Sequence, residues 1–509
     1  MPGSITRQFR LNNAEQFKEA FSEASPDYLY LFIGRLQAWP NGDTAPTPSD
    51  TVTGSSYDPW HSMIAAKKIN TNDMSFAVRR YNWTSGTVYA EYDDKNTLFY
   101  DSQFYVLTDD NHVYKCLFNN RGAASTVKPT GTSTSTISTA DGYRWKFMYD
   151  VSNADVLKFV TPAYIPVKTL TADDSSSQWD VQVAASNGAI DIIDVTANGS
   201  NYVTRANTIT GVTNSSVIIL DGGSSGNDDT YNGLSLFIAS GLGAGQIRTI
   251  SDYNGVNKTV TLSTGFTISP NTSSEFHVGP TITVTGDGSG ALAYANVESG
   301  QIKKINMINV GSNYSKASVG ITGVSGSGAT AVARVSPPGG HGSDPVSELN
   351  GYNVMLNVRI SGNEGNNFPT NNDFRIIGTL KNPLLANGSA ATDSAYDQTT
   401  KLTIIGKTGG NFEQDEILVG PVSGATGRVV SFDNTNATGT TGILKVVDIN
   451  GVFVNERITG NTSAVTANVT STQVGELSPY KGDILYVENR VAAIRSADQI
   501  EDIKLIIQY

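Results

Sequence analysis

The alternation of apolar and polar positions along the chain predicts short β-strands more often than helices. Near the N-terminus the apolar run Tyr28–Ile33, followed by Gly34, predicts a buried strand. Near the C-terminus, 483–488 and 503–507 have the same character, and so apolar a terminal strand is expected to pair into a sheet. Aromatic and β-branched residues predict further strands at 98–107, 112–118 and 143–150.

One segment near the N-terminus has the period of a helix instead. Asn13 followed three residues later by Gln16 is the pattern of a capping box, so we expect the helix to begin there. Pro26 is expected to stop it. The apolar face of this helix comprises Ala14, Phe17, Phe21 and Ala24, at spacings of three and four residues.

Residues 180–475 have a different texture, in which short β-rich runs alternate with Gly, Asn, Asp and Ser. Turn signals recur about every ten residues, as in β-sandwiches and similar modules, and we expect no helix in this span. The predicted fold class is therefore mainly β and multidomain. Strand candidates in this span are 216–220, 234–238, 247–250 and 281–285.

Internal repeats support duplicated β modules of about 40 residues within this span. The frame GSGA-x-A-x-A-x-V occurs at 288–297 and 326–335. Gly199-Ser-Asn-Tyr202 precedes Ile209-Thr-Gly-Val212, and Gly311-Ser-Asn-Tyr314 precedes Ile321-Thr-Gly-Val324 at the same spacing. A weaker pair is Glu416–Gly420 and Glu456–Gly460, each followed by S-x-x-T-x-x-V. With two copies of each, we interpret them as inserted domains and not as a solenoid.

The distribution of tryptophan indicates where the domains meet. Trp39, Trp60, Trp83, Trp145 and Trp179 all precede residue 180. We predict a core domain whose first part is 1–170, an inserted β domain at 171–330, a second inserted β region at 331–477, and C-terminal strands at 478–509 that complete the core domain. The two terminal segments would together form one mixed α/β-sandwich-type domain.

Composition and charge narrow the possible partners. Only 16% of the 509 residues are charged, and the net charge is −12. The basic pairs at 67–68, 79–80 and 303–304 are isolated, so we expect no nucleic-acid partner. No apolar stretch approaches the roughly 18 residues of a membrane span, and the N-terminus does not resemble a signal peptide, so we expect a soluble protein without a membrane partner.

The sequence contains no pattern typical of a catalytic, cofactor or metal site. Cys116 is the only cysteine, and we expect it to be buried in a strand. The four histidines have no metal-ligand spacing. Gly241–Gly245 predicts a hairpin turn more readily than a phosphate loop, and Gly226–Asp229 is a weak candidate for a calcium loop. We therefore predict no enzyme activity, no cofactor and no resident metal.

Motifs at the two ends of the chain resemble those of one protein family. The order is Ile33-Gly-Arg35, Ala38-Trp-Pro40, the loop Pro46–Asp50, Asp58-Pro-Trp-His-Ser-Met63, Arg79-Arg-Tyr-Asn-Trp83, Val113-Tyr-Lys-Cys-Leu117, Asp141-Gly-Tyr-Arg-Trp-Lys-Phe147, Gly482–Arg490 and Ala497–Ile503. In that order they resemble the gene product eight family, the baseplate wedge subunits of T-even-like contractile-tailed phages. The resemblance covers about 1–170 and 478–509.

The resemblance implies a structural protein of the virion, located in the tail baseplate and assembled in the host cytoplasm. It implies a homodimer that joins other baseplate wedge proteins around the hub and takes part in the rearrangement that triggers sheath contraction. The near absence of cysteine fits assembly in a reducing compartment. No catalytic residue is implied.

Two other function classes remain open from the sequence. Residues 180–475 could be an adhesin that binds host-surface glycans, with Tyr202 and Tyr314 stacking on sugars, although tyrosines that support turns are the more common case. A polysaccharide-degrading tail enzyme is the weakest reading, because such proteins usually carry long β-helical repeats and placed acids.

Overall fold

The computed structural model describes residues 6–23, 26–35, 44, 47, 51–52, 56–93 and 102–509. Most of this chain is strand, arranged in several separate sheets, so the prediction of a mainly β, multidomain fold is confirmed. It divides into two compact units. Unit 1 comprises Met1–Val78, Ala154–Pro166 and Tyr352–Tyr509, and unit 2 comprises Arg79–Asn153 and Val167–Gly351.

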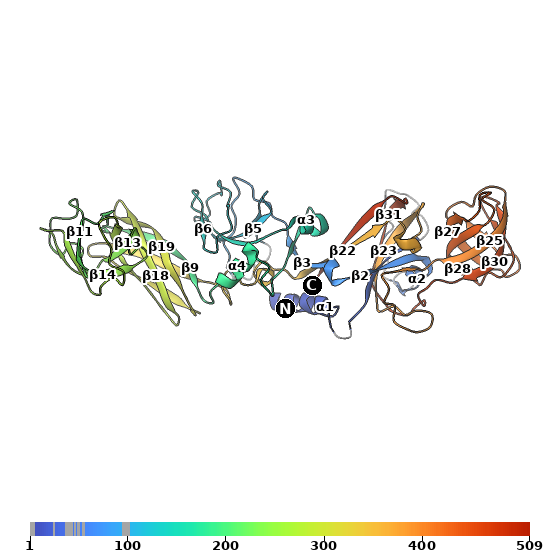
Figure 1. Ribbon diagram of the computed structural model, residues 1–509, viewed down its shortest axis with the longest axis horizontal. Helices are drawn as coiled ribbons and strands as arrows, with labels where there is room; N and C mark the ends of the chain where they lie inside the picture. The colour runs from blue at the N-terminus through green and yellow to red at the C-terminus, as the bar shows by residue number, and fades with distance from the viewer. Residues whose placement is uncertain are drawn as a thin grey trace. The chain divides into compact units, whose positions relative to one another are not determined.

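The core of unit 1 is a sandwich of a five-stranded and a four-stranded sheet (Figure 1). The larger sheet has the order β24-β2-β1-β23-β31 and the smaller one β32-β22-β3-β8. The bounds are β1 Leu29–Gly34, β2 Met63–Ile69, β3 Met74–Arg79, β8 Tyr164–Val167, β22 Asn353–Ser361, β23 Asn372–Lys381, β24 Ala395–Asp397, β31 Asp483–Arg495 and β32 Ile500–Gln508; the helices are α1 Arg7–Glu19, α2 Asp58–Ser62 and α3 Asn153–Phe159, with short 3₁₀ turns η2 Thr71–Asp73 and η4 Glu364–Asn366.

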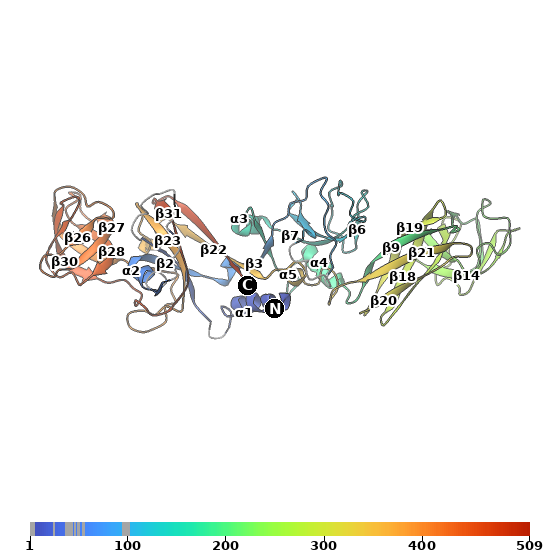
Figure 2. The same cartoon turned by 180° about the vertical axis from the view of Figure 1, so that it is seen from behind.

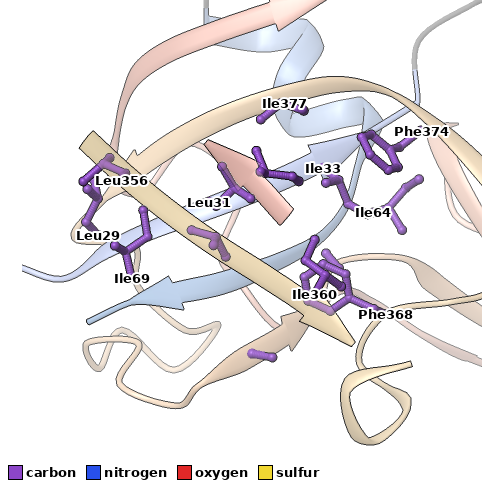
Figure 3. Close-up of a cluster of buried hydrophobic side chains, with 14 of the residues drawn as sticks. Leu29, Leu31, Ile33, Ile64, Ile69, Leu356, Ile360, Phe368, Phe374 and Ile377 are labelled. Atoms are coloured by element: carbon purple, nitrogen blue, oxygen red, sulfur yellow. The ribbon is translucent and has the colours of Figure 1, made fainter. Parts of the chain in front are cut away.

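Strand β1 is buried on both faces, which explains its unbroken apolar sequence. Successive side chains of a strand point to opposite faces. Leu29, Leu31 and Ile33 enter the core between the two sheets, while Tyr30 and Phe32 pack on the other face of the larger sheet. Figure 3 shows the first set meeting side chains of β22 and β23, among them Leu356, Ile360, Phe374 and Ile377.

The C-terminal strands complete both sheets of this sandwich, as the sequence predicted for an apolar terminal strand. Strand β31 pairs with β23, and β32 pairs with β22. Their direct neighbours are thus strands from 353–381, which the sequence assigned to an inserted region. That assignment is wrong for 353–397, because β22, β23 and β24 hydrogen-bond to β3, β1 and β2 and cannot be separated from them.

Helix α1 begins earlier than the sequence predicted. Thr6, and not Asn13, caps it, with its Oγ1 accepting a hydrogen bond from the Phe9 N–H at 3.3 Å. The helix ends at Glu19, before Pro26. The predicted face is correct at Ala14, Phe17 and Phe21, which pack on the sandwich core. Ala24 lies outside the described residues.

A closed six-stranded barrel follows β24 in unit 1. Its order is β25-β28-β27-β26-β29-β30, with its own apolar core around Leu402, Leu444 and Val469 (Figure 1). The strands are β25 Thr400–Thr408, β26 Ile417–Val419, β27 Thr426–Asn434, β28 Gly442–Asn450, β29 Arg457–Gly460 and β30 Thr466–Gln473.

Unit 2 begins with a four-stranded sheet rich in aromatic residues. Its order is β4-β5-β7-β6. The predicted strands at 112–118 and 143–150 are confirmed, whereas of 98–107 only β4 is a strand and 98–101 lies outside the described residues. The bounds are β4 Tyr105–Leu107, β5 His112–Phe118, β6 Ile137–Ser138 and β7 Arg144–Asp150.

Two short helices in unit 2 contradict the expectation of no helix at 180–475. Helix α4, Ser177–Ala184, extends into that span, and α5, Pro345–Glu348, lies within it. The one-turn helix α5 is too short to have an apolar period. Asp344 caps it by accepting a hydrogen bond from the Ser347 N–H at 3.2 Å.

The rest of unit 2 consists of two strand modules. The first contains the repeats: β9 pairs with β21, β18 with β19, and β17 with β20 (Figure 2). The second is a seven-stranded sheet in the order β10-β16-β13-β14-β15-β12-β11. The bounds are β9 Ile190–Ser200, β10 Arg205–Thr208, β11 Gly211–Asn214, β12 Val217–Ile219, β13 Ser235–Ser240, β14 Ile247–Asn254, β15 Thr259–Leu262, β16 Glu275–Gly279, β17 Thr281–Gly286, β18 Ser289–Glu298, β19 Gln301–Ser312, β20 Ala317–Thr322 and β21 Ser327–Val335.

The boundaries of the two compact units differ from the predicted domain boundaries at 170, 330 and 477. Strand pairing between distant segments defines the units, whereas the predicted boundaries followed composition. The predicted boundaries stay predictions about segments that fold independently.

Candidate functional site

A buried ionic network surrounds Arg35, the last residue of the Ile33-Gly-Arg35 motif. Arg35 is 1% exposed and follows β1. Its Nη2 lies 2.7 Å from Asp373 Oδ1, and its Nε lies 2.8 Å from Asp415 Oδ1. Arg375 contacts the other oxygen of each carboxylate, at 2.9 Å and 2.6 Å. Two arginines and two aspartates therefore alternate in a closed ring.

This network connects the sandwich to the barrel. Arg35, Asp373 and Arg375 belong to the larger sheet, whereas Asp415 lies just before β26 of the barrel. Burial raises the pKa of Asp415, but the hydrogen bond from Arg375 and the charge of Arg35 outweigh it, so the pKa lies below 3.8. The carboxylate is charged at neutral pH and holds both arginines. Arg35 belongs to a motif recognised in the sequence, whereas Asp373, Arg375 and Asp415 belong to none of the motifs.

The motif Asp58–Met63 supplies helix α2 and the start of β2. Trp60 and Met63 are buried in the cluster on the outer face of the larger sheet. Beside them the hydroxyl of Tyr480 lies 2.8 Å from His61 Nε2, and the ring of Tyr57 lies 5.4 Å from that of Tyr480. Trp60 and Tyr480 line a cavity of about 390 Å³ next to β28. The motif residues here shape the sandwich and its contact with the barrel.

The motifs of unit 2 build a turn and an aromatic core. Asp141 accepts hydrogen bonds from the N–H groups of Thr126 and Val127 at 2.8 and 2.9 Å. Tyr143 stacks on the fully buried Trp145, with ring centroids 5.3 Å apart. Trp83 donates from Nε1 to Ser125 Oγ at 3.1 Å.

Cys116 is buried in β5, as predicted. Burial raises the pKa of the Cys116 thiol well above its usual value. The thiolate that nucleophilic chemistry needs is therefore disfavoured.

The C-terminal motif contains a second buried arginine. Arg495, at the end of β31, pairs with Glu501 of the Ala497–Ile503 motif at 3.0 Å. It also donates to the carbonyl oxygens of Pro369 and Gly362 at 2.8 and 2.6 Å. Of the other motifs, Ala38-Trp39-Pro40 and most of the loop Pro46–Asp50 lie outside the described residues.

Tyr202 and Tyr314 are not available for stacking on sugars. Both are 5% exposed and belong to the apolar core of the repeat module. The Tyr202 hydroxyl accepts a hydrogen bond from the Ala329 N–H at 3.2 Å. Their role is the one expected of turn-supporting tyrosines, since each fills the space beside the turn of a GSNY segment.

The glycine that opens each GSNY segment is required by its surroundings. Gly199 and Gly311 have φ of 61° and 67°. A Cβ at Gly199 would lie 2.5 Å from the Ala329 nitrogen, and one at Gly311 would lie 2.6 Å from the Ala291 nitrogen. The two copies thus make equivalent contacts, each with the GSGA segment of the strand that pairs with it.

The shared Ile-Thr-Gly-Val segments, in contrast, are not equivalent. Residues 209–212 lead into β11 of the seven-stranded sheet, whereas 321–324 form the end of β20 in the repeat module and the two residues after it. The true counterpart of β20 is β17, with which it pairs over six residues. The seven-stranded sheet is therefore inserted between β9 and β17, inside the first copy.

In the barrel, two repeated glutamates bind each other's turns. Glu416 accepts hydrogen bonds from the N–H groups of Thr462 and Ser463, at 3.3 and 3.0 Å. Glu456 accepts from those of Val422 and Ser423, at 2.8 and 3.1 Å, and from the Ser423 hydroxyl. Both side chains are buried. Each S-x-x-T turn is thus held by the glutamate of the other copy, which explains why both were repeated in the sequence.

The weaker candidates for chemistry are resolved as turns. Gly241–Gly245 joins β13 and β14 as a hairpin, as predicted. In the loop Gly226–Asp229, Asp228 accepts from the Gly255 N–H and Asp229 from Asn232, both at 2.7 Å. Within the described ranges no three His, Cys, Asp or Glu side chains are grouped as metal ligands. No helix among those residues is long and apolar enough to cross a membrane.

Comparisons with known proteins provide no family assignment. The chain matches no protein-family model and no curated protein. One solved structure, described as the virion of a native gene transfer agent particle, aligns over 52% of this chain and 83% of its own, with 11% identity and a TM-score of 0.16. At that score the alignment does not establish a common fold.

Proposed function

We propose that the protein is a structural subunit of a phage-type virion, and more specifically a component of the baseplate wedge of a contractile tail. In this role it joins wedge subunits around the hub and takes part in the rearrangement that triggers sheath contraction. Its partners are a second copy of itself and other wedge proteins. No reaction is assigned to it.

The observation that carries the proposal is the position of the terminal motifs. The segments that resemble the wedge family at 33–35, 58–63, 482–490 and 497–503 come from opposite ends of the chain and lie in one sandwich. Their conspicuous residues are structural: Trp60 and Met63 are core, Arg35 connects the sheet to the barrel, and Arg495 ties the last two strands to neighbouring loops. Buried core residues and buried ion pairs of this kind are expected in a structural subunit that must keep its fold within an assembly.

The added modules support the same role. The barrel and the seven-stranded sheet each have an apolar core of their own. Modules that each have their own core offer several separate polar surfaces, which suits a subunit with many neighbours. The adhesin hypothesis proposed that Tyr202 and Tyr314 stack on sugars, and it loses that support because both side chains are buried.

The test is to locate the chain in intact particles by cryo-EM. We expect density for the sandwich in paired copies around a sixfold baseplate, next to the hub. Density restricted to fibre tips would refute the wedge position while leaving a virion role, and absence of the chain from purified particles would refute both. A particle with an affinity tag placed in the exposed barrel turn at Gly451 serves as a marker for the assignment.

A further inference from the structure

A cavity of about 330 Å³ in unit 2 has both basic side chains and hydroxyl groups in its lining. Strand β7 contributes Arg144 and Lys146, and β19 contributes Lys304. The hydroxyl groups come from a Thr- and Ser-rich segment at 134–138, which includes β6. Arg144 and Lys146 belong to the motif Asp141–Phe147, whose buried Trp145 lies between them in β7.

Two of the three cations have no protein acceptor. Arg144 is 7% exposed, and its guanidinium lies 5.3 Å from the centre of the Phe118 ring but makes no hydrogen bond or ion pair with any described residue. Lys304 is likewise without one within the described part of the chain. Lys146 donates only to the Thr134 carbonyl oxygen, at 2.5 Å. Burial lowers the pKa of all three groups, and the nearby Arg144 charge lowers that of Lys304 further.

The negative groups nearby do not balance these charges. Asp191 is the carboxylate that lines the cavity, and burial raises its pKa. Glu348 is paired with Lys115. The charge of Asp194 raises the pKa of Arg144, but Asp194 lies 3.6 Å from Arg334. His341 also lines the cavity, and burial holds its pKa well below 6.5, so that it is neutral. Three cations thus face one carboxylate in a chain whose net charge is −12.

We propose that this cavity binds a phosphate group, either free or carried by a small organic ester. A guanidinium and two ammonium groups are the donors that phosphate oxygens prefer, and hydroxyl groups of the same lining can donate further hydrogen bonds. An oxyanion in the cavity would give the Arg144 guanidinium the charged acceptor that the described residues do not supply. The volume exceeds that of phosphate alone, so the carrier of an ester also fits. This inference is independent of the wedge proposal.

The test is isothermal titration calorimetry of the full chain with sodium phosphate, at an ionic strength kept constant with chloride. We expect saturable binding to the wild type and about tenfold weaker binding to Lys304→Gln, because one charged hydrogen bond is lost. Lys303→Gln is the matched control. Lys303 directly precedes Lys304 in β19, is exposed and contacts Gln301. Lys304→Arg keeps the charge and should retain most of the affinity.

A second titration with glycerol 1-phosphate distinguishes the two sources of the phosphate group. Tighter binding of the ester supports a carried phosphate, and equal or weaker binding supports the free ion. Far-UV circular dichroism of each variant establishes that it is folded. The proposal is overturned if phosphate gives no saturable heat, or if Lys303→Gln and Lys304→Gln weaken binding equally.

Discussion

At the scale of single residues, the buried charges around Arg35 are tolerated because each has a counter-ion in place. Arg35 is almost fully buried, yet both aspartates that face it are also held by Arg375. Burying an ion pair costs desolvation energy, and removing one partner leaves the other as a buried charge without a counter-ion. The ring is therefore more sensitive to loss of one member than any exposed pair of the same chemistry.

Arg35→Ala should lower the free energy of unfolding of unit 1 by about 3–5 kcal/mol, because Asp373 and Asp415 lose a buried counter-ion. Urea denaturation measures this change. Arg359→Ala is the control: Arg359 binds Asp502 at 3.0 Å but is 59% exposed, and its loss should cost less than about 1 kcal/mol. Equal effects of the two variants would contradict the role given to the network.

The tyrosines show how far residue-scale prediction could reach. The repeat of Gly-Ser-Asn-Tyr was visible in the sequence, and the turn it predicts is present. The Tyr202 ring can point inward because Gly323 and Gly326 leave room for it. These two glycines lie more than a hundred residues further along the chain, so the local sequence does not indicate the orientation. Similarly, nothing near Arg35 in sequence indicated Asp373 or Asp415.

At the scale of elements, the barrel depends on an exchange between its two copies. Glu416 and Glu456 each hold the turn that follows the other's strand, and β26 and β29 pair with each other. Neither copy can satisfy its own turn. The barrel should accordingly unfold as one cooperative unit.

Glu456→Gln should destabilise the barrel by about 1.5–3 kcal/mol, since an amide cannot accept all the hydrogen bonds that the carboxylate receives from Val422 and Ser423. Hydrogen exchange of the amides of β26 and β29 measures the effect locally. Glu413→Gln, at an exposed position shortly before β26, is the control and should change little. Protection lost only at 422–423, with β29 unchanged, would argue against a cooperative barrel.

The same carboxylate predicts a dependence on pH. Burial raises the pKa of Glu456, but hydrogen bonds from Ser423 and Val422 outweigh it and hold the pKa below 4.5. A group whose pKa is lower in the folded state contributes stability above its unfolded pKa and loses it as the pH falls further. The barrel should thus lose stability below about pH 4.5, and Glu456→Gln should lose less over the same range. Thermal denaturation at several pH values tests this, and identical pH profiles would refute it.

Strand positions were more predictable than helix ends. Strands at 29–34, 112–118 and 144–150 follow from short apolar or aromatic runs, because a strand buried on both faces needs apolar residues throughout. The start of α1 was misplaced, since both Thr6 and Asn13 are suitable caps and most of the residues between them are polar. Only the contact of Leu11 with the interior distinguishes the longer helix.

At the scale of the whole molecule, modules are inserted at positions where the chain leaves and returns at neighbouring points. Arg205 at the start of the seven-stranded module pairs with Val278 near its end. Lys401 and Gln473 are paired in the same way at the entrance of the barrel. Directly paired residues lie about 5 Å apart, so each module could be removed without stretching the chain that remains.

Replacing 205–278 with a short Gly-Ser loop should leave the repeat module folded, with β9 still paired to β21. The excised piece should fold alone, because the buried residues of its core lie within 209–278. Comparison of amide NMR spectra of the fragment, the shortened chain and the full chain measures both expectations. Collapse of the β9 and β21 signals in the shortened chain would show that the insertion is part of the repeat module's fold.

The sequence could not reveal which intermediate segments belong to the core. Residues 353–397 share the polar, Gly-rich texture of their surroundings, yet β22 and β23 are central strands of the sandwich. Composition changes gradually there, while strand pairing is decided by partners at 29–34 and 74–79. The insertion of a module into the first repeat was hidden for the same reason.

The pairing of β1 with β23 sets an order of events during translation. Leu29 finds its partner Lys381 only after the whole of unit 2 has been made. At roughly 5–20 residues per second, β1 waits roughly 20–70 s on the ribosome for this partner. The modules encoded in the middle of the gene therefore fold first, and the sandwich made from its two ends closes last.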